Sequence, residues 1–159
     1  MAGLYIHIPF CREACIYCDF HFSISLGHLD SMLEAIRKEL QVRRDFLEGE
    51  ELQTIYMGGG TPSVVNSAWI SLLMDTIREN YTVSKQAEIT LEGNPDDLDP
   101  EYLSSIRQTG VNRLSIGIQS FYDEHLKFMN RRHDAIKAKT CLEEAYNAGF
   151  DNLSIDLIY

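Results

Sequence analysis

The sequence predicts an α/β protein whose parallel strands form a partial (β/α) barrel. Five short strand-like segments alternate with helical stretches along the 159 residues. Repeated strand–helix–strand units with short connections indicate a parallel sheet with right-handed crossovers. Each strand keeps one face small or polar, whereas strands covered by helices on both faces are almost continuously apolar. The two observations together favour a barrel-like sheet with a site at the carboxyl ends of its strands.

Strands and helices can be assigned in order from periodicity and end signals. The strands are expected at residues 4–8, 54–57, 88–92, 113–118 and 153–158. Helical spacing of apolar residues, capping residues and glycines predict helices from Leu29 to near Gly49, after Ser67, from Asp99-Pro100 to Gly110, and from near Asp134 to near Gly149.

Polar side chains share one face of the strands near their carboxyl ends. On the fourth strand Ser115 and Gly117 alternate with isoleucines, and Gln119 follows on the same face. The same alternation puts Glu92 and Asp156 on the polar faces of the third and fifth strands. We therefore expect Glu92, Gln119 and Asp156 to face the barrel interior.

Length and charge limit the class of protein. A complete eight-stranded barrel needs about 250 residues, so we expect one domain, 1–159, truncated after its fifth strand at Tyr159. The net charge of −10 argues against nucleic-acid binding, which needs a basic surface. Since no apolar run approaches the roughly 20 residues of a membrane span and no secretion signal is present, we expect a cytoplasmic protein.

The strongest chemical signal is Cys11-x3-Cys15-x2-Cys18, directly after the first strand. Each iron of a [4Fe–4S] cluster needs one outside ligand, normally a cysteine thiolate. Three cysteines leave one iron open for a small molecule, much as a catalytic zinc keeps a free position. The cysteines alone also allow a structural zinc site completed by His21.

A glycine-rich turn, Gly58-Gly59-Gly60-Thr61-Pro62, follows the second strand. Glycines let the backbone approach a ligand closely. By itself this segment could be only a tight strand-to-helix turn, but a zinc site gives no reason for it at a neighbouring strand end.

Together the motifs resemble radical S-adenosylmethionine (SAM) enzymes and, more narrowly, the oxygen-independent coproporphyrinogen III oxidase-like family. The matching stretches, in the family's order, are residues 5–11, 58–62, 92–95, 113–121, 130–131 and 156–159. The match runs from end to end of the chain. By this resemblance, the chain would be the N-terminal part of a radical SAM core, without the last strand–helix unit and the C-terminal domain.

The resemblance implies a [4Fe–4S] cluster on the three cysteines, bound SAM and an electron donor protein. It implies that Glu92 and the loop from Gly58 to Thr61 hold the methionine ammonium. Arg131 would pair with the methionine carboxylate in a fork-to-carboxylate match. Gln119 and Asp156 would hydrogen-bond the ribose hydroxyls.

Five other residues have less specific expectations. Tyr5 and His7 resemble family residues that line the site, and Tyr17 is expected to shield the cluster or pack on adenine. His133 is expected to be a solvated residue at a helix start. Cys141 lies on an apolar helical stripe and is expected in the core.

Two subgroups of the family remain open, and two departures favour one of them. The oxidases, which decarboxylate two propionates of coproporphyrinogen III, continue the cluster motif as Cys-Gly-Cys-Asn, but this chain has Cys18-Asp19-Phe20-His21. The oxidases also carry a long arm before the first strand, whereas this chain begins three residues before it. Both departures favour haem chaperones of the HemW type, which bind haem or a related porphyrin and pass haem to acceptor proteins. A zinc-stabilised binding module is the alternative of another class.

Overall fold

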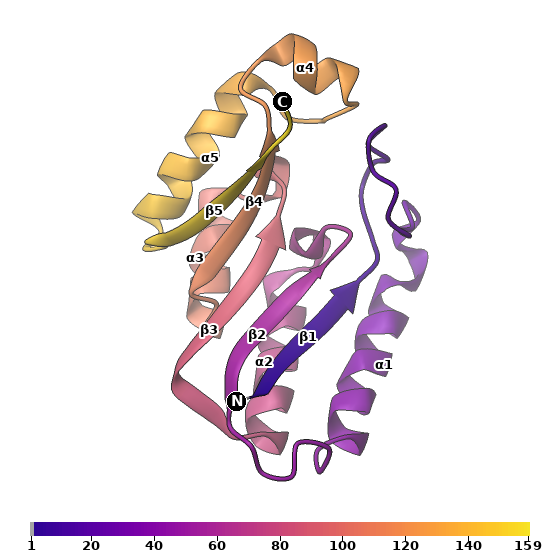
Figure 1. The fold of residues 1–159 in the computed structure, drawn as a ribbon, viewed down its shortest axis with the longest axis vertical. Helices are drawn as coiled ribbons and strands as arrows, with labels where there is room; N and C mark the ends of the chain where they lie inside the picture. Colours follow the sequence, from indigo (N-terminus) through magenta and orange to yellow (C-terminus); the bar gives the residue numbers. More distant parts are fainter. Residues whose placement is uncertain (1) are drawn as a thin grey trace.

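The computed structural model describes residues 2–159 and contains one parallel sheet with strand order β1-β2-β3-β4-β5 (Figure 1). The strands are β1 (Ala2–Ile8), β2 (Leu52–Gly59), β3 (Val83–Gly93), β4 (Arg113–Gln119) and β5 (Asn152–Leu157). The helices are α1 (Leu29–Val42), α2 (Ser67–Asn80), α3 (Pro100–Thr109), α4 (Asp123–Phe128) and α5 (Ala135–Asn147), with the 3-10 turns η1 (Leu26–His28), η2 (Pro62–Val64) and η3 (Pro95–Asp97). The predicted alternation of parallel strands and helices is confirmed.

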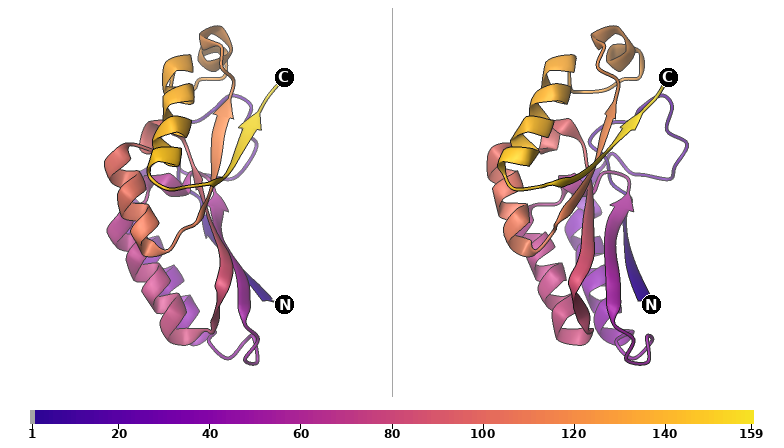
Figure 2. Two further views of the ribbon diagram at one scale, coloured as in Figure 1. Left: turned by 90° about the vertical axis from the view of Figure 1, so that its left-hand side faces the viewer. Right: turned by 60° about the vertical axis from the view of Figure 1, so that its left-hand side comes forward.

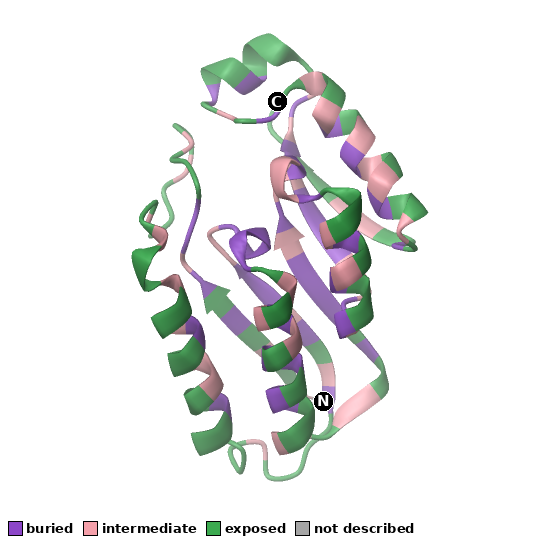
Figure 3. Cartoon of the chain, turned by 180° about the vertical axis from the view of Figure 1, so that it is seen from behind, coloured by how far each residue is buried: buried purple, intermediate pink, exposed green. Residues whose placement is uncertain are grey.

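Helices cover only one face of the sheet. Figure 2 shows α1, α2, α3 and α5 on the same side, and within residues 2–159 the opposite face carries no helix. The apolar side chains of the strands belong to the core that the helices cover, including the fully buried Met57, Leu91, Leu114 and Ile116. Figure 3 colours the buried residues of the strands and helices purple. This one-sided cover explains why each strand alternates between apolar and polar residues instead of being apolar throughout.

Side-chain caps define where three of the helices begin. Asp99 accepts a hydrogen bond from Tyr102 N at the start of α3, where Pro100 takes the first helical position. Asp134 caps α5 in the same way. Asn66 caps α2. The left-handed Gly110 (φ 102°) ends α3.

The first helix ends earlier than predicted, and one helix was not predicted. α1 stops at Val42 rather than near Gly49. Beyond Leu40 it has no apolar stripe to bury, since Val42 and Phe46 are both 74% exposed. Because α4 is six residues long and buries only Leu126, its sequence carries no helical periodicity.

Two strands differ from expectation at their edges. β3 begins at Val83, before a register shift relative to β2 that interrupts its pairing until Glu88. The apolar residues of β5 stay partly exposed, with Ile155 at 38% and Leu157 at 49%.

Cys141 is fully buried in the core, as predicted. No helix within residues 2–159 is long and apolar enough to cross a membrane.

Candidate cofactor site

A cavity of about 650 Å³ opens at the carboxyl ends of the strands, on the face without helices. The side chains that alternate away from the helices, such as His7, Glu92 and Ser115, line it. The predicted site residues along its wall are Tyr5, Cys11, Cys15, Tyr17, Cys18, Gly59, Gly60, Thr61, Glu92, Gln119, Arg131 and Asp156. The structure thus gathers residues from the whole chain around one space, and of the predicted set only Gly58 lies outside its lining.

Glu92 and the glycine turn form one hydrogen-bonded unit. One carboxylate oxygen, Oε1, accepts from the Tyr56 hydroxyl at 2.7 Å, and Oε2 accepts from Gly59 N at 3.1 Å. A Cβ at Gly58 would lie 3.1 Å from the Glu92 carboxylate, so this glycine makes room for Glu92 without lining the cavity. Burial and the neighbouring Glu92 raise the pKa of Tyr56 to about 12, which keeps its hydroxyl a donor at neutral pH.

The Arg131 guanidinium joins the strand ends to the cysteine loop. Its Nη2 donates to Asn94 Oδ1 and to Gly117 O, both at 2.6 Å. Its Nη1 points to Cys15 Sγ at 3.5 Å and to the Tyr17 hydroxyl at 3.4 Å. Arg131 Nε is buried without a hydrogen-bond partner, although a buried polar group costs free energy if unpaired. The geometry therefore leaves one donor of Arg131 available.

The cysteine loop is closed at its base and held at its far side. A parallel bridge joins Phe10 to Ser23, and Cys11 N donates to Ser23 O at 3.0 Å. On the far side Asn130 Nδ2 donates to Ala14 O at 2.8 Å. These contacts fix the base and one interior point of a loop that has neither helix nor strand within it.

The three loop cysteines are free thiols that face the same cavity. Cys11 is buried, whereas Cys15 and Cys18 are partly exposed. Burial raises the pKa of Cys11, and a hydrogen bond from Thr61 partly opposes that shift. Among residues 2–159, no three His, Cys, Asp or Glu side chains already stand in the arrangement of a metal site.

Gln119 and Asp156 reach the cavity from adjacent strands. Gln119 has a left-handed backbone (φ 62°), uncommon for a residue with a side chain, at a register shift between β4 and β5. A Cβ at Gly117 would lie 2.9 Å from Gln119 Nε2, so the glycine allows the Gln119 amide to lie over β4. Sequence alternation correctly placed both polar side chains on the open face.

His133 differs from the prediction of a solvated residue. It is only 4% exposed, and its Nε2 bonds to Ile118 O at 3.0 Å. Its Nδ1 lies 3.9 Å from Asp96 Oδ2 and has no hydrogen-bond partner. Asn130, with a left-handed backbone (φ 57°), follows α4, and the chain beyond it brings the imidazole against the end of β4. Burial, with the charge of Arg131, lowers the pKa of His133.

A chain of polar contacts that sequence reasoning did not identify supports this wall of the cavity. Arg12 pairs at 3.1 Å with Asp97, whose side chain is 7% exposed, and Asp97 accepts from the Ser63 hydroxyl at 2.8 Å. Ser63 Oγ in turn accepts from Asn94 N, and Asn94 Oδ1 accepts from Arg131. None of these residues belongs to a periodic pattern, so only the fold brings them together. Tyr56 was detectable, because it alternates with the apolar residues of β2.

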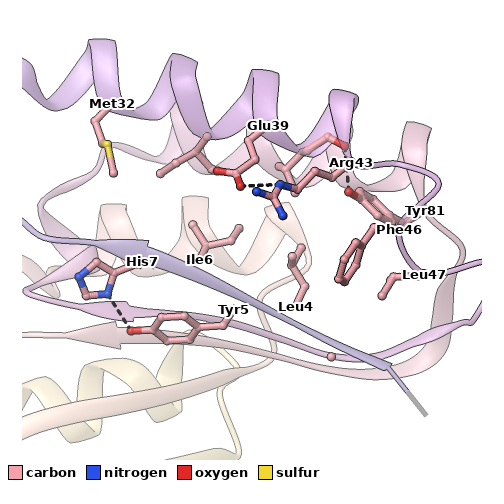
Figure 4. A pocket seen from close by; sticks show the side chains of 13 residues that line it. Leu4, Tyr5, Ile6, His7, Met32, Glu39, Arg43, Phe46, Leu47 and Tyr81 are labelled. Atoms are coloured by element: carbon pink, nitrogen blue, oxygen red, sulfur yellow. Dashed lines mark hydrogen bonds and ion pairs between the residues drawn. The ribbon is translucent and has the colours of Figure 1, made fainter.

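A second cavity, of about 350 Å³, lies between β1 and α1 (Figure 4). Leu4, Met32 and Phe46 contribute to its apolar lining, and an exposed Glu39–Arg43 ion pair of 2.8 Å lies along its α1 wall. It contains none of the cysteines, and Tyr5 and His7 are the only residues of its described lining that were expected at the site. The strand-end cavity is therefore the candidate site.

Comparison with known proteins points to one family. A sequence model described as "Radical SAM superfamily" matches residues 5–159. The chain is 39% identical over 156 residues to a protein of Lactococcus lactis named "Heme chaperone HemW", covering 98% of this chain and 40% of that protein. It is 36% identical over 159 residues to an Escherichia coli protein named "Oxygen-independent coproporphyrinogen III oxidase", covering 99% and 35%.

A solved structure shares the fold closely. The Escherichia coli structure titled "Coproporphyrinogen III oxidase (HemN) from Escherichia coli is a Radical SAM enzyme" superimposes with a TM-score of 0.91 at 36% identity, over 99% of this chain and 37% of that one. The predicted partial barrel is thus confirmed as the N-terminal part of a known barrel. The chain spans about 40% of the length of the curated relatives it matches.

Gly60 is predicted to tolerate no side chain. A Cβ there would lie 2.7 Å from Phe10 O and 3.0 Å from Cys11 Sγ, and the backbone atom cannot move aside as a side chain could. Gly60→Ala should therefore lower the free energy of unfolding by about 1–3 kcal/mol, as measured by urea denaturation. In Gly27→Ala, the nearest atom would be Ser25 Oγ at 3.8 Å, so this control should change stability by less than about 0.5 kcal/mol. Equal unfolding midpoints for the two variants would contradict the prediction.

Proposed function

The chain belongs to the radical SAM superfamily, and from that membership we propose that it binds a [4Fe–4S] cluster and SAM in the strand-end cavity. We further propose that the whole protein is a haem chaperone of the HemW type. The observation that carries the proposal is the convergence of three free cysteines and the predicted SAM-binding side chains on one cavity.

The donor set suits an iron–sulfur cluster. Thiolates are the usual ligands of such clusters, and three of them leave one iron open. Cys11, Cys15 and Cys18 lie on a loop whose base and Ala14 are held by hydrogen bonds, so a metal group can gather the thiols as it binds. Gly60 leaves room for the Cys11 sulfur, since a Cβ on Gly60 would lie 3.0 Å from it.

The opposite wall of the cavity suits the amino-acid end of SAM. Glu92 is a carboxylate backed by two donors, and its partners hold its orientation for an ammonium group. Arg131 has a buried Nε with no partner, as expected of a guanidinium that bonds a ligand carboxylate. Gln119 and Asp156, from β4 and β5, offer polar groups for ribose hydroxyls.

With both groups bound, the cluster would supply one electron for reductive cleavage of SAM, taken from an electron donor protein. The chain's own residues bind and orient. Glu92 and Arg131 would fix the two ends of the methionine group and would so restrict the orientation of SAM in the cavity. Tyr17, whose pKa burial raises to about 12, stays neutral, and its hydroxyl lies 3.4 Å from Arg131 Nη1.

Phe20 supports the chaperone over the oxidase. It takes the place of a cysteine of the oxidase motif, lines the cavity and is 77% exposed. A bulky apolar ring there changes the cavity wall and offers a flat surface to a porphyrin ligand. The oxidase is the second candidate, because a curated oxidase is 36% identical to the chain and a haem chaperone 39%. Binding of haem, its delivery to acceptor proteins and a cytoplasmic location stay predictions.

Loss of any loop cysteine should abolish the cluster. The full-length protein, reconstituted with iron and sulfide without oxygen, should hold one [4Fe–4S] cluster, seen as a brown colour and measured by iron and sulfide analysis. Cys11→Ala, Cys15→Ala and Cys18→Ala should each remove it, because one thiolate ligand is lost. Cys141→Ala is the matched control and should keep the cluster, since this thiol is buried in α5. A colourless wild-type protein that binds zinc would instead support the zinc module.

Loss of Arg131 should weaken SAM binding. Removing one partner of a desolvated charge pair costs about 2–5 kcal/mol, or about 30- to 5,000-fold in affinity. We expect that loss for Arg131→Ala and for Glu92→Gln in calorimetric titrations of SAM into the reconstituted protein, with cluster content unchanged. Arg132→Ala, an exposed neighbour, should bind as wild type does. Unchanged affinity in both site variants would show that SAM binds elsewhere.

The whole protein should bind haem and should not convert coproporphyrinogen III to protoporphyrinogen IX. The physical reason is the altered cavity wall at Asp19-Phe20. Haem binding is measured by absorbance titration, and conversion by an anaerobic assay with SAM and a reductant, read out by porphyrin fluorescence after oxidation. Repeated turnover to the decarboxylated porphyrin would show that the protein is an oxidase.

A further inference from the structure

Thr61 is bonded to a cysteine sulfur. Its hydroxyl donates to Cys11 Sγ at 3.2 Å, across 50 positions of sequence. Both residues are buried, with Thr61 7% exposed and Cys11 9% exposed. Water therefore does not compete strongly for this hydrogen bond.

The Thr61 hydroxyl bonds to the Cys11 sulfur and does not cap the turn that follows. Thr61 occupies the N-cap position of η2, where a threonine oxygen commonly accepts from a backbone N–H, yet its side chain makes no such cap bond. The hydroxyl is directed at the sulfur instead. Since Thr61 precedes Pro62, its backbone conformation is also restricted.

The backbone on both sides holds the hydroxyl in place. Thr61 N donates to Phe10 O at 2.8 Å, and Gly60 N donates to Ile8 O at 2.9 Å. These two bonds tie the glycine turn directly to the segment that carries Cys11. Gly60, with no Cβ, lets the sulfur approach. The distance between Thr61 Oγ1 and Cys11 Sγ is thus set by main-chain contacts.

We propose that Thr61 raises the reduction potential of the cluster through this hydrogen bond to Cys11. The inference rests on the proposed function, in which Cys11 is an iron ligand. Reduction adds one negative charge to the cluster, and part of it resides on the thiolate sulfurs. A donor aimed at a thiolate stabilises the reduced state more than the oxidised state, so hydrogen bonds to sulfur raise the potential.

Thr61 can be tested apart from SAM binding. Arg131 also points to a cysteine sulfur, that of Cys15, but it has further contacts with Asn94 and Gly117. Replacing Arg131 would disturb several of these at once. The Thr61 hydroxyl has Cys11 as its hydrogen-bond partner, and valine reproduces the shape of threonine without the donor.

The experiment is a redox titration of the reconstituted full-length protein, followed by electron paramagnetic resonance, without SAM. Thr61→Val should shift the midpoint potential of the cluster to a more negative value, because the donor is lost. Thr61→Ser keeps a hydroxyl and should restore most of the wild-type potential. Thr61→Ala, which removes the donor without adding bulk, should shift the potential in the same direction as Thr61→Val.

Two results would overturn the proposal. The first is an unchanged potential in Thr61→Val and Thr61→Ala with full cluster content. The second is failure of both variants to hold a cluster that Thr61→Ser retains, which would assign the hydroxyl to cluster retention instead of potential. A wild-type protein without any iron–sulfur cluster would contradict the proposed function itself, so the two failures are distinguishable.

Discussion

Packing of the four long helices against a single face of the parallel sheet is the constraint on which the site depends. It buries Met57, Leu91 and their neighbours on that side and leaves the alternate residues of each strand facing open space. Those residues are free to be polar, because no helix must pack on them. Since all strands are parallel, their carboxyl ends meet at one edge, where Glu92 and Asp156 share a cavity.

Loops complete the wall of the cavity that the strands form, and polar contacts rather than apolar burial hold these loops in place. The contacts run from Arg12 through Asp97, Ser63 and Asn94 to Arg131, which returns to the cysteine loop. Each member of such a chain depends on its neighbours, so the stabilising effects are not additive. The cavity thus has a rigid floor of strands and a wall whose shape rests on a few hydrogen bonds.

Sequence alone predicted what periodicity and local chemistry encode. Alternation located Glu92, Gln119 and Asp156 on the open face, and capping rules located the start of α3 at Asp99. Prediction from sequence failed for α4, which buries one side chain. It also failed for His133, whose burial depends on how the chain turns after α4. The hydrogen bonds of Tyr56 with Glu92 and of Thr61 with Cys11 join positions far apart in the sequence. No local sequence pattern predicts such contacts.

The partly exposed apolar residues of β5 favour association between copies of this 159-residue chain in concentrated solution. Within residues 2–159, β5 pairs with β4 along one edge and its other edge carries no strand, and an unpaired edge is a template for pairing with another copy. Asp156 is the one charge between Leu153 and Tyr159, and it lines the cavity. The net charge of −10 keeps molecules apart at low ionic strength, but at 1 M salt the Debye length falls to about 3 Å. Dilute buffers of low salt therefore favour a dispersed preparation, and salting-out conditions favour strand-to-strand association.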